Sequence, residues 1–424
     1  MKGNRRMKPQ SNFEREYAVP ALAALKNVEQ IYDDIALENT KKVMAAFKKE
    51  QVADYYLKPT TGYAYGDVGR ETLDKIYCHI FHTEAALVRS QFVSGTHALA
   101  VAMLGNLKPG DEVIGATGTP YDTMQTIIGS PKKIPGSLVD IGVTYKEIPM
   151  HGRRCDLAKL EKAITPATRM VHIQRSCGYS QERETLSVLE IGEIITCVKK
   201  VNPKIICFVD NCYGEFVEIL EPTDMGADLV AGSLIKNLGG GLAPTGGYIV
   251  GREDLVYNAA CRLTVPGLAG EMGATLGDTA REFYQGLFLA PHVVMQAVKT
   301  SIYAANIFNK LGYKVKPGFA ETRHDIIQCI TLNTPRALEA FCQAIQFNSP
   351  IDSNVVPEKG NLPGYADPVI MAAGTFVQGA SIELSADGPM RPPYNVFMQG
   401  GLTLEHGILA VNAAAVMIGE NKNK

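Results

Sequence analysis

The chain has 424 residues, 46% of them hydrophobic, and a formal net charge of −2 from 42 basic and 44 acidic side chains. This length and composition predict a soluble globular protein with more than one domain, and the near-neutral charge argues against nucleic acid or a membrane surface as a partner. The nine cysteines form no C-x-x-C pair and the eight histidines show no ligand spacing beside them, so we expect neither a disulfide framework nor a metal site. No apolar run is long enough to span a bilayer and none follows the basic N-terminus, so a cytoplasmic location is expected.

The first half of the chain changes from a helical to an alternating pattern. Apolar residues recur at helical spacing over residues 20–50, and we assign residues 1–59 to an N-terminal helical segment. The Gly- and Tyr-rich stretch "TTGYAYGDVGRE" at 60–71 predicts a loop. From there to residue 290, runs that are apolar throughout alternate with helical patterns. Such runs are typical of a parallel sheet covered on both faces, which predicts a large α/β domain over residues 60–290.

The individual elements follow from the same patterns. The strands expected in the large domain are at residues 111–115, 169–174, 205–210, 227–233 and 246–251, with helices that include 97–107 and 188–201. A long helical pattern covers residues 287–315. Beyond it, the strand-like runs "DIIQCITL", "VIMAAGTF" and "SIELSAD" predict a small C-terminal α+β domain over residues 291–424.

One lysine, Lys236, lies in the stretch "AGSLIKNLGGGLAPTGGYIVG" (231–251), three residues after Ser233. Burial lowers the pKa of a lysine amine and frees its lone pair to form a Schiff base, while glycines let the backbone pass close to a bound group. Asp210 ends the preceding expected strand, where it either caps the next helix or pairs with a protonated ring nitrogen. Because neighbouring parallel strands end at the same edge of a sheet, we expect Asp210 and Lys236 to lie close together.

Two more segments lead to the same edge. Ser94, Gly95 and Thr96 begin the expected helix in "VSGTHALA"; free N–H groups there can bind an anion, although small residues cap most helices. Tyr121 follows an expected strand in a proline-marked turn, where it either stacks on a planar ligand or is an ordinary surface tyrosine. A reactive lysine, a carboxylate for a ring nitrogen and an anion-binding helix end match the needs of pyridoxal 5'-phosphate.

The segments "VSGTHA", "PYDT", "FVDNCYGEF", "AGSLIKN" and "SIELSADGP" resemble those of the methionine gamma-lyase-like, aluminium-resistance group of carbon–sulfur lyases. This group lies in the cystathionine-metabolism branch of the fold-type I pyridoxal-phosphate enzymes, whose fold is transferase-like. The resemblance runs from "TGYAYGDVGRE" to "QGGLT", nearly the whole chain. It implies a mostly parallel seven-stranded sheet in the large domain, a small C-terminal domain, and a homotetramer of two dimers with active sites at the dimer interface.

The resemblance also assigns roles to particular residues. It implies that Lys236, Asp210 and Tyr121 are catalytic. It implies that Tyr65 and Arg70 reach the cofactor phosphate of the neighbouring subunit. The full set that it assigns to the cofactor is Ser94, Gly95, Thr96, Tyr121, Asp210, Ser233, Lys236, Tyr65, Arg70 and Arg175.

The implied activity is elimination of a sulfur-containing group from an amino acid, with Lys236 as the base at Cα and Tyr121 assisting the leaving group. Arg391 in "DGPMRPPY" corresponds to the arginine that holds the substrate carboxylate, whereas its position alone suits a surface turn equally well. Cys177 stands where relatives carry a basic residue. Aldol cleavage or racemisation with the same cofactor, and a fold relative that holds the cofactor without catalysis, stay open. A non-covalent nucleotide or phosphate binder ranks low because the glycine patterns of nucleotide-binding loops are missing.

Overall fold

The computed structural model describes residues 11–151, 154–180, 183–362, 365 and 367–422; the first ten residues of the predicted N-terminal segment lie outside this part of the chain. Its N-terminal and large-domain elements are η1 (Glu14–Ala18), α1 (Val19–Lys26), α2 (Glu29–Lys49), η2 (Asp54–Leu57), α3 (Val68–Phe81), β1 (Ala85–Arg89), α4 (Gly95–Asn106), β2 (Glu112–Gly115), α5 (Asp122–Ile128), β3 (Thr144–Glu147), β4 (Met150–His151), β5 (Arg154–Cys155), α6 (Leu157–Ala163), β6 (Thr168–Gln174), α7 (Val188–Val201), β7 (Ile206–Asp210), η3 (Pro222–Met225), β8 (Leu229–Ser233), η4 (Asn237–Gly239), β9 (Gly247–Gly251), α8 (Glu253–Leu263) and η5 (Ala269–Glu271). The remaining elements are α9 (Thr279–Lys310), β10 (Lys314–Lys316), β11 (Ile327–Thr331), α10 (Pro335–Phe347), β12 (Val369–Ala372), β13 (Ser385–Pro389), β14 (Asn395–Gln399) and α11 (Leu404–Lys422).

The large domain is built on one seven-stranded sheet in the order β1-β9-β8-β7-β6-β2-β3. Strands β3, β2, β6, β7 and β8 pair in parallel, and β9 runs antiparallel to both β8 and β1. The central strands β7, β8 and β9 are buried along their whole length because helices cover both faces of the sheet. The predicted mostly parallel seven-stranded sheet is therefore confirmed.

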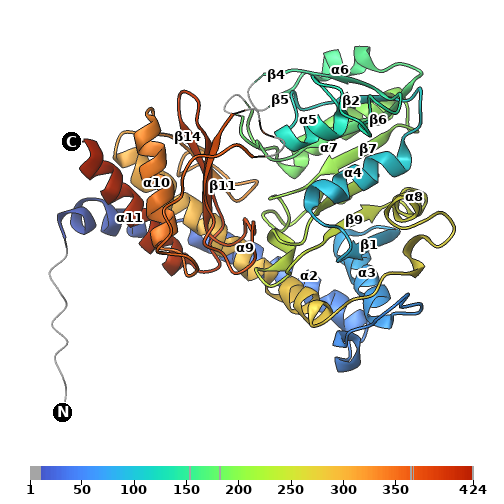
Figure 1. Ribbon diagram of the computed structural model, residues 1–424, viewed down its shortest axis with the longest axis horizontal. Coiled ribbons are helices and arrows are strands. Elements are labelled where there is room, and N and C mark those ends of the chain that lie inside the picture. Colours follow the sequence, from blue (N-terminus) through green and yellow to red (C-terminus); the bar gives the residue numbers. More distant parts are fainter. Residues whose placement is uncertain (1–10, 152–153, 181–182, 363–364, 366, 423–424) are drawn as a thin grey trace.

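The small domain carries a five-stranded antiparallel sheet in the order β10-β11-β14-β13-β12. Helix α10 packs on this sheet, and α11 packs on α10 and α9. Figure 1 shows this sheet and its helices set apart from the large sheet, in the orange and red part of the chain. The run "SIELSAD" forms a strand only from Ser385 onward, because β13 begins four residues later than the run does.

Helix α9 joins the two domains. It spans 32 residues, begins eight residues before the predicted helical pattern, and crosses the predicted domain boundary at residue 290 without a break. It packs against α2 on one side and α11 on the other, and Figure 1 shows it running from the small domain to the large one. The N-terminal helical pattern is divided in two, with α1 ending at Lys26 and α2 beginning at Glu29.

No helix in the described part of the chain combines the length and the hydropathy that a membrane crossing needs. Within those same residues, His, Cys, Asp and Glu side chains nowhere gather in a group of three that could hold a metal ion.

Candidate active site

The ends of β7 and β8 bring two predicted site residues together. The two strands are parallel neighbours, with Asp210 opposite Ala231 in the register. Asp210 is the last residue of β7, and Lys236 lies three residues beyond the end of β8. Both line one cavity of about 170 Å³. Asp210 and Lys236 therefore lie at the same edge of the sheet, as the sequence predicted.

The cavity lies between the two domains. The large domain contributes to its lining Thr96, Tyr121, Gln174, Tyr179, Asp210, Cys212, Tyr213 and Lys236. The small domain contributes Tyr365, Asp387, Phe397 and Gln399. The wall from the large domain, which is referred to below as the large-domain wall, therefore carries Lys236. The wall from the small domain, the small-domain wall, carries a second carboxylate, Asp387.

The ammonium of Lys236 lies among acidic and aromatic side chains. Its Nζ is 3.9 Å from the centroid of the Tyr213 ring. Burial alone would lower the pKa of Lys236, as the sequence suggested, but Cys212, Tyr213, Asp210 and Glu215 act in the opposite direction and raise the pKa above its ordinary value. The expectation of a depressed lysine pKa is therefore wrong for this arrangement, because it considered burial without the neighbouring acids.

Asp210 is held by the chain that follows it. Its Oδ1 accepts a hydrogen bond of 3.1 Å from the backbone N–H of Cys212, as Asp side chains do in turns. The segment after β7 forms turns, so Asp210 does not cap a helix. Burial raises the pKa of this carboxyl, while Lys236, the Cys212 N–H and Arg183 counteract part of the rise.

The first turn of α4 abuts Ser233. Ser94 is the N-cap, and its hydroxyl accepts a hydrogen bond of 3.1 Å from the His97 N–H. A Cβ atom on Gly95 would lie 2.7 Å from the Cβ of Ser233, so only glycine permits this close approach. The Ser233 hydroxyl is buried and has no hydrogen-bond partner among the described residues. An orphaned hydroxyl beside a helix N-terminus is suited to an anion.

Tyr121 belongs to a cluster of tyrosines. Its backbone N–H donates to Oε1 of Gln174 over 2.8 Å, and its hydroxyl contacts that of Tyr365. Its ring meets those of Tyr179 and Tyr365 edge to face, with centroids 5.5 and 6.0 Å apart. Burial raises the pKa of Tyr121 well above its ordinary value, so the hydroxyl keeps its proton at neutral pH.

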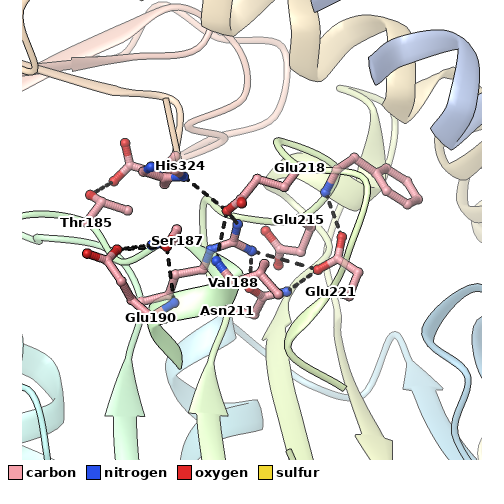
Figure 2. Close-up of polar contacts among 12 residues, drawn as sticks. Thr185, Ser187, Val188, Glu190, Asn211, Glu215, Glu218, Glu221 and His324 are labelled. Atoms are coloured by element: carbon pink, nitrogen blue, oxygen red, sulfur yellow. Dashed lines mark hydrogen bonds and ion pairs between the residues drawn. The ribbon is translucent and has the colours of Figure 1, made fainter. Parts of the chain in front are cut away.

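Arg175 lies outside the cavity, contrary to its assignment to the cofactor. Its fully buried guanidinium donates to Asn211 Oδ1 over 2.8 Å and to Glu218 Oε1 over 2.7 Å, and lies 3.8 Å from Glu221 (Figure 2). Glu218 is also 3.1 Å from His324. These partners occupy Arg175 inside the fold, because a buried guanidinium needs anions and acceptors around it. Its assignment to the cofactor has no geometric support.

Six more predicted site residues lie outside the lining: Ser94, Gly95 and Ser233, which adjoin one another behind it, and Arg70, Tyr65 and Arg391. Arg70 is buried and donates to the carbonyls of Ala64, Gly273 and Glu271 in its own chain, over 2.9 to 3.1 Å. Tyr65 is 58% exposed. The side chain of Arg391 is half-exposed and forms a 2.7 Å ion pair with Asp367. The assignments of these three to a neighbouring phosphate and to a substrate carboxylate stay predictions.

Several cavity residues were not singled out from the sequence. Tyr213 follows Asp210 by three residues and has a backbone φ of 75°, a conformation that is uncommon outside glycine and often marks functional sites. Tyr179 follows the β6 strand end, where parallel strands place ligand contacts. Asp387 and Gln399 lie on antiparallel strands, where no such rule applied. Cys177 packs with Cys329 and Phe397 rather than in the cavity lining, and burial raises the pKa of its thiol to about 12.

This sheet, with its lysine and aspartate at neighbouring strand ends, is the fold of the fold-type I pyridoxal-phosphate enzymes. The pyridoxal-5'-phosphate-dependent protein YhfS from Escherichia coli shares the fold, with a TM-score of 0.61 at 16% identity over 90% of this chain and 96% of that one.

The chain belongs to the methionine gamma-lyase family, whose model matches residues 15–418. It is 47% identical over 394 residues to the uncharacterized protein YnbB of Bacillus subtilis, which covers 92% of this chain and 93% of YnbB. The crystal structure of a carbon–sulfur lyase involved in aluminium resistance from Clostridium novyi is 46% identical, with a TM-score of 0.89 over 93% of each chain.

Proposed function

We propose that this protein is a pyridoxal-phosphate-dependent carbon–sulfur lyase that eliminates a sulfur-containing group from an amino acid. The observation that carries the proposal is the cavity between the domains that the Lys236 amine and the Asp210 carboxylate line together at neighbouring strand ends. Membership of the methionine gamma-lyase family supports the same class of reaction. The relative from Clostridium novyi is itself described as a carbon–sulfur lyase.

The residues of the cavity fit pyridoxal phosphate. Lys236 would bind it covalently, and Asp210 would face its ring nitrogen. The orphaned Ser233 hydroxyl, Thr96 and the N-terminal N–H groups of α4 would bind its phosphate. When bound, the cofactor supplies an electron sink for a carbanion at the substrate Cα.

The chain's own groups are suited to moving the protons of an elimination. Lys236 would remove the proton from Cα, and the Asp210 carboxylate and the face of the Tyr213 ring beside it stabilise the ammonium that forms. Tyr121, which keeps its proton at neutral pH, would donate that proton to the departing sulfur. Both side chains are part-buried in the cavity between the domains, which limits the competition of bulk water for these protons.

A panel of sulfur amino acids tests the proposal. The cofactor-loaded protein should release a keto acid and a thiol from at least one member of the panel, and Lys236→Ala should release neither. Release of glycine and an aldehyde from a β-hydroxy amino acid such as threonine, or exchange of the Cα configuration of a panel member without thiol release, would instead support aldol cleavage or racemisation.

We further propose that the loop before α3 contacts a second copy of the chain. Tyr63 and Tyr65 are 66% and 58% exposed, and their rings stack with centroids 5.5 Å apart. Exposed paired aromatics are typical of subunit interfaces. Mixing Tyr65→Ala with Lys236→Ala subunits should restore part of the activity if Tyr65 completes the neighbour's site. Inactive hybrids of folded, oligomeric subunits would remove Tyr65 from that role. The same mixing with Arg70→Ala tests Arg70.

A further inference from the structure

The small-domain wall of the cavity carries a carboxylate that the proposed reaction does not use. Asp387 lies in β13, is 8% exposed and lines the cavity. Its Oδ1 and the hydroxyl of the neighbouring Tyr179 complete no hydrogen bond of normal geometry among the described residues, although Tyr179 and Gln399 lie close enough to lower the pKa of Asp387. A buried carboxylate oxygen without a partner is costly for the fold, and such costs are concentrated where a ligand completes the site.

The charges that line the cavity do not balance around Asp387. Among the described lining residues, Asp210 and Asp387 are the acids, Lys236 is the one cation, and no arginine is present. Asp210 already accepts the Cys212 N–H and is adjacent in the sheet to the strand that leads to Lys236. Once Lys236 is engaged by the cofactor, the described lining of this chain holds no cation for Asp387.

The side chains around Asp387 are suited to a cation. The lining contains the rings of Tyr121, Tyr179, Tyr213 and Tyr365, and aromatic faces attract ammonium groups. The Lys236 ammonium, 3.9 Å from the centroid of Tyr213, already makes such a contact in this cavity. An anionic group in the same place would face an uncompensated buried carboxylate.

We propose that Asp387 determines substrate specificity by binding a second, distal ammonium group, so that the preferred sulfur amino acid has a cationic end to its side chain. The inference rests on the proposed lyase function. The substrate's α-amino group must react at Lys236 on the large-domain wall, and a side chain that crosses the cavity reaches Asp387 on the opposite wall. The recognised chemistry is a primary amine separated from Cα by a short chain.

Binding to the cofactor-loaded protein tests this inference without any carbon–sulfur bond. Lysine, 2-aminoheptanoate and 2-aminopimelate have side chains of matched length that end in an ammonium, a methyl and a carboxylate group. We expect calorimetry to show lysine binding about 10- to 100-fold tighter than 2-aminoheptanoate, and 2-aminopimelate binding weakest. Equal or tighter binding of either other compound overturns the inference.

The variant Asp387→Asn keeps the shape and removes the charge. It should bind lysine and 2-aminoheptanoate with affinities within a few-fold of each other, while Asp387→Glu should retain part of the preference. Asp122→Asn is the control, because this carboxylate follows Tyr121 in the chain but does not line the cavity; the preference should persist there. A lysine preference that survives in Asp387→Asn overturns the inference.

The pH dependence of the wild type gives a test that needs no variant. Burial raises the pKa of Asp387 to about 6, although Tyr179, Gln399 and Lys236 lower it in part. The preference for lysine should therefore shrink as the pH falls below about 6, because protonation removes the charge. The other titratable groups that act on this carboxyl do not change their protonation near pH 6, because the pKa of each lies above its ordinary value. These groups are Lys236, Tyr121, Tyr179, Tyr213, Tyr365 and Cys342. A pH-independent preference counts against Asp387.

Turnover of the matching sulfur compounds separates the two proposals. S-(2-aminoethyl)cysteine, S-propylcysteine and S-(2-carboxyethyl)cysteine have the same three end groups, and kcat/KM should follow the order of binding. If neither these three nor any other sulfur amino acid of the panel is cleaved while lysine binding still depends on Asp387, the lyase function fails and the ammonium site stands. If Asp387→Asn lowers kcat equally for all three, Asp387 transfers a proton and the specificity role is wrong.

Discussion

Two buried carboxylates face the same cavity from different domains, and their surroundings differ. Asp210 ends a parallel strand, accepts the N–H of Cys212 and is next to the strand that leads to Lys236. Asp387 lies within the antiparallel strand β13, opposite Met371 and Phe397 in the register, and one of its oxygens has no partner among the described residues.

Asp210 has its partners within the fold, whereas a ligand would complete the surroundings of Asp387. The partners of Asp210 are part of the fold, so its charge is supported before any substrate arrives. An unpartnered buried polar group costs about 1–3 kcal/mol, and the fold bears this cost at Asp387 at the place where a substrate side chain would enter. The large-domain wall is therefore suited to the chemistry common to all substrates, and the small-domain wall to choosing among them.

The largest effect should follow the loss of Lys236. Lys236→Ala should abolish cofactor trapped by borohydride and all turnover, because no other lysine lines the described cavity. Lys299→Ala is the control: Lys299 is buried, but its Nζ is 2.5 Å from Asp33, outside the cavity. Peptide mapping after reduction checks both. Trapped cofactor on a peptide without residue 236 would remove the large-domain wall from the proposed chemistry.

The two carboxylates should respond differently to the same substitution. Asp210→Asn should lower kcat by about 10²- to 10⁴-fold for every substrate, because the charge that serves the reaction itself is lost. Asp387→Asn should instead change KM, and mainly for substrates with a cationic end. Steady-state kinetics on the three S-alkylcysteines measures both. Full activity in Asp210→Asn, or the same kcat loss in both variants, would erase the distinction between the walls.

The large-domain wall could be predicted from the sequence because short apolar runs mark its strands, and because parallel strands all end at the same edge of the sheet. A run that is apolar throughout marks a buried parallel strand, and parallel strands end at one edge, so Asp210 and Lys236 could be placed together without any long-range information. The same logic identified the α4 start and Tyr121. It could not place Arg175, which also follows a strand end but turns into the interior, where Glu218 and Asn211 bind it.

The small-domain wall could not be predicted, because antiparallel strands present alternate residues to two faces and their register sets which residue meets a ligand. Asp387 lies in the run "SIELSAD", but the strand begins only at Ser385, and the residues that face the cavity are set by its register with β14, which pairs Asp387 with Phe397. Strand β14 itself was not predicted. Its residues Phe397 and Gln399 reach the cavity only through that pairing.

A third group of carboxylates shows what happens when partners inside the fold are removed. Arg175→Met should leave Glu218 and Glu221 without their guanidinium and destabilise the protein by about 3–5 kcal/mol. Urea unfolding measures the loss, and Arg175→Lys should recover part of it. The absorption spectrum of bound cofactor should be unchanged, because Arg175 does not line the cavity. Weakened cofactor binding with unaltered stability would restore the assignment that the geometry opposes.

The smallest effect concerns Glu215, a carboxyl that is only half partnered and lies outside the cavity lining. Its Oε1 accepts the Tyr248 hydroxyl over 2.8 Å, and its Oε2 has no partner among the described residues. Burial raises its pKa from 4.5 to about 8, so the folded protein keeps a proton that the unfolded chain releases. The free energy of unfolding should therefore fall as the pH rises from about 4.5 to 8, by up to about 1.4 kcal/mol per pH unit from this group. Glu215→Gln has no such proton to lose, so urea unfolding at pH 5, 6, 7 and 8 should show the variant gaining stability relative to the wild type as the pH rises. Parallel pH curves would mean that Glu215 is ionised in the folded protein. In that case Glu215 would carry a charge as Asp387 does, and the contrast between a carboxyl outside the cavity and one inside it would be lost.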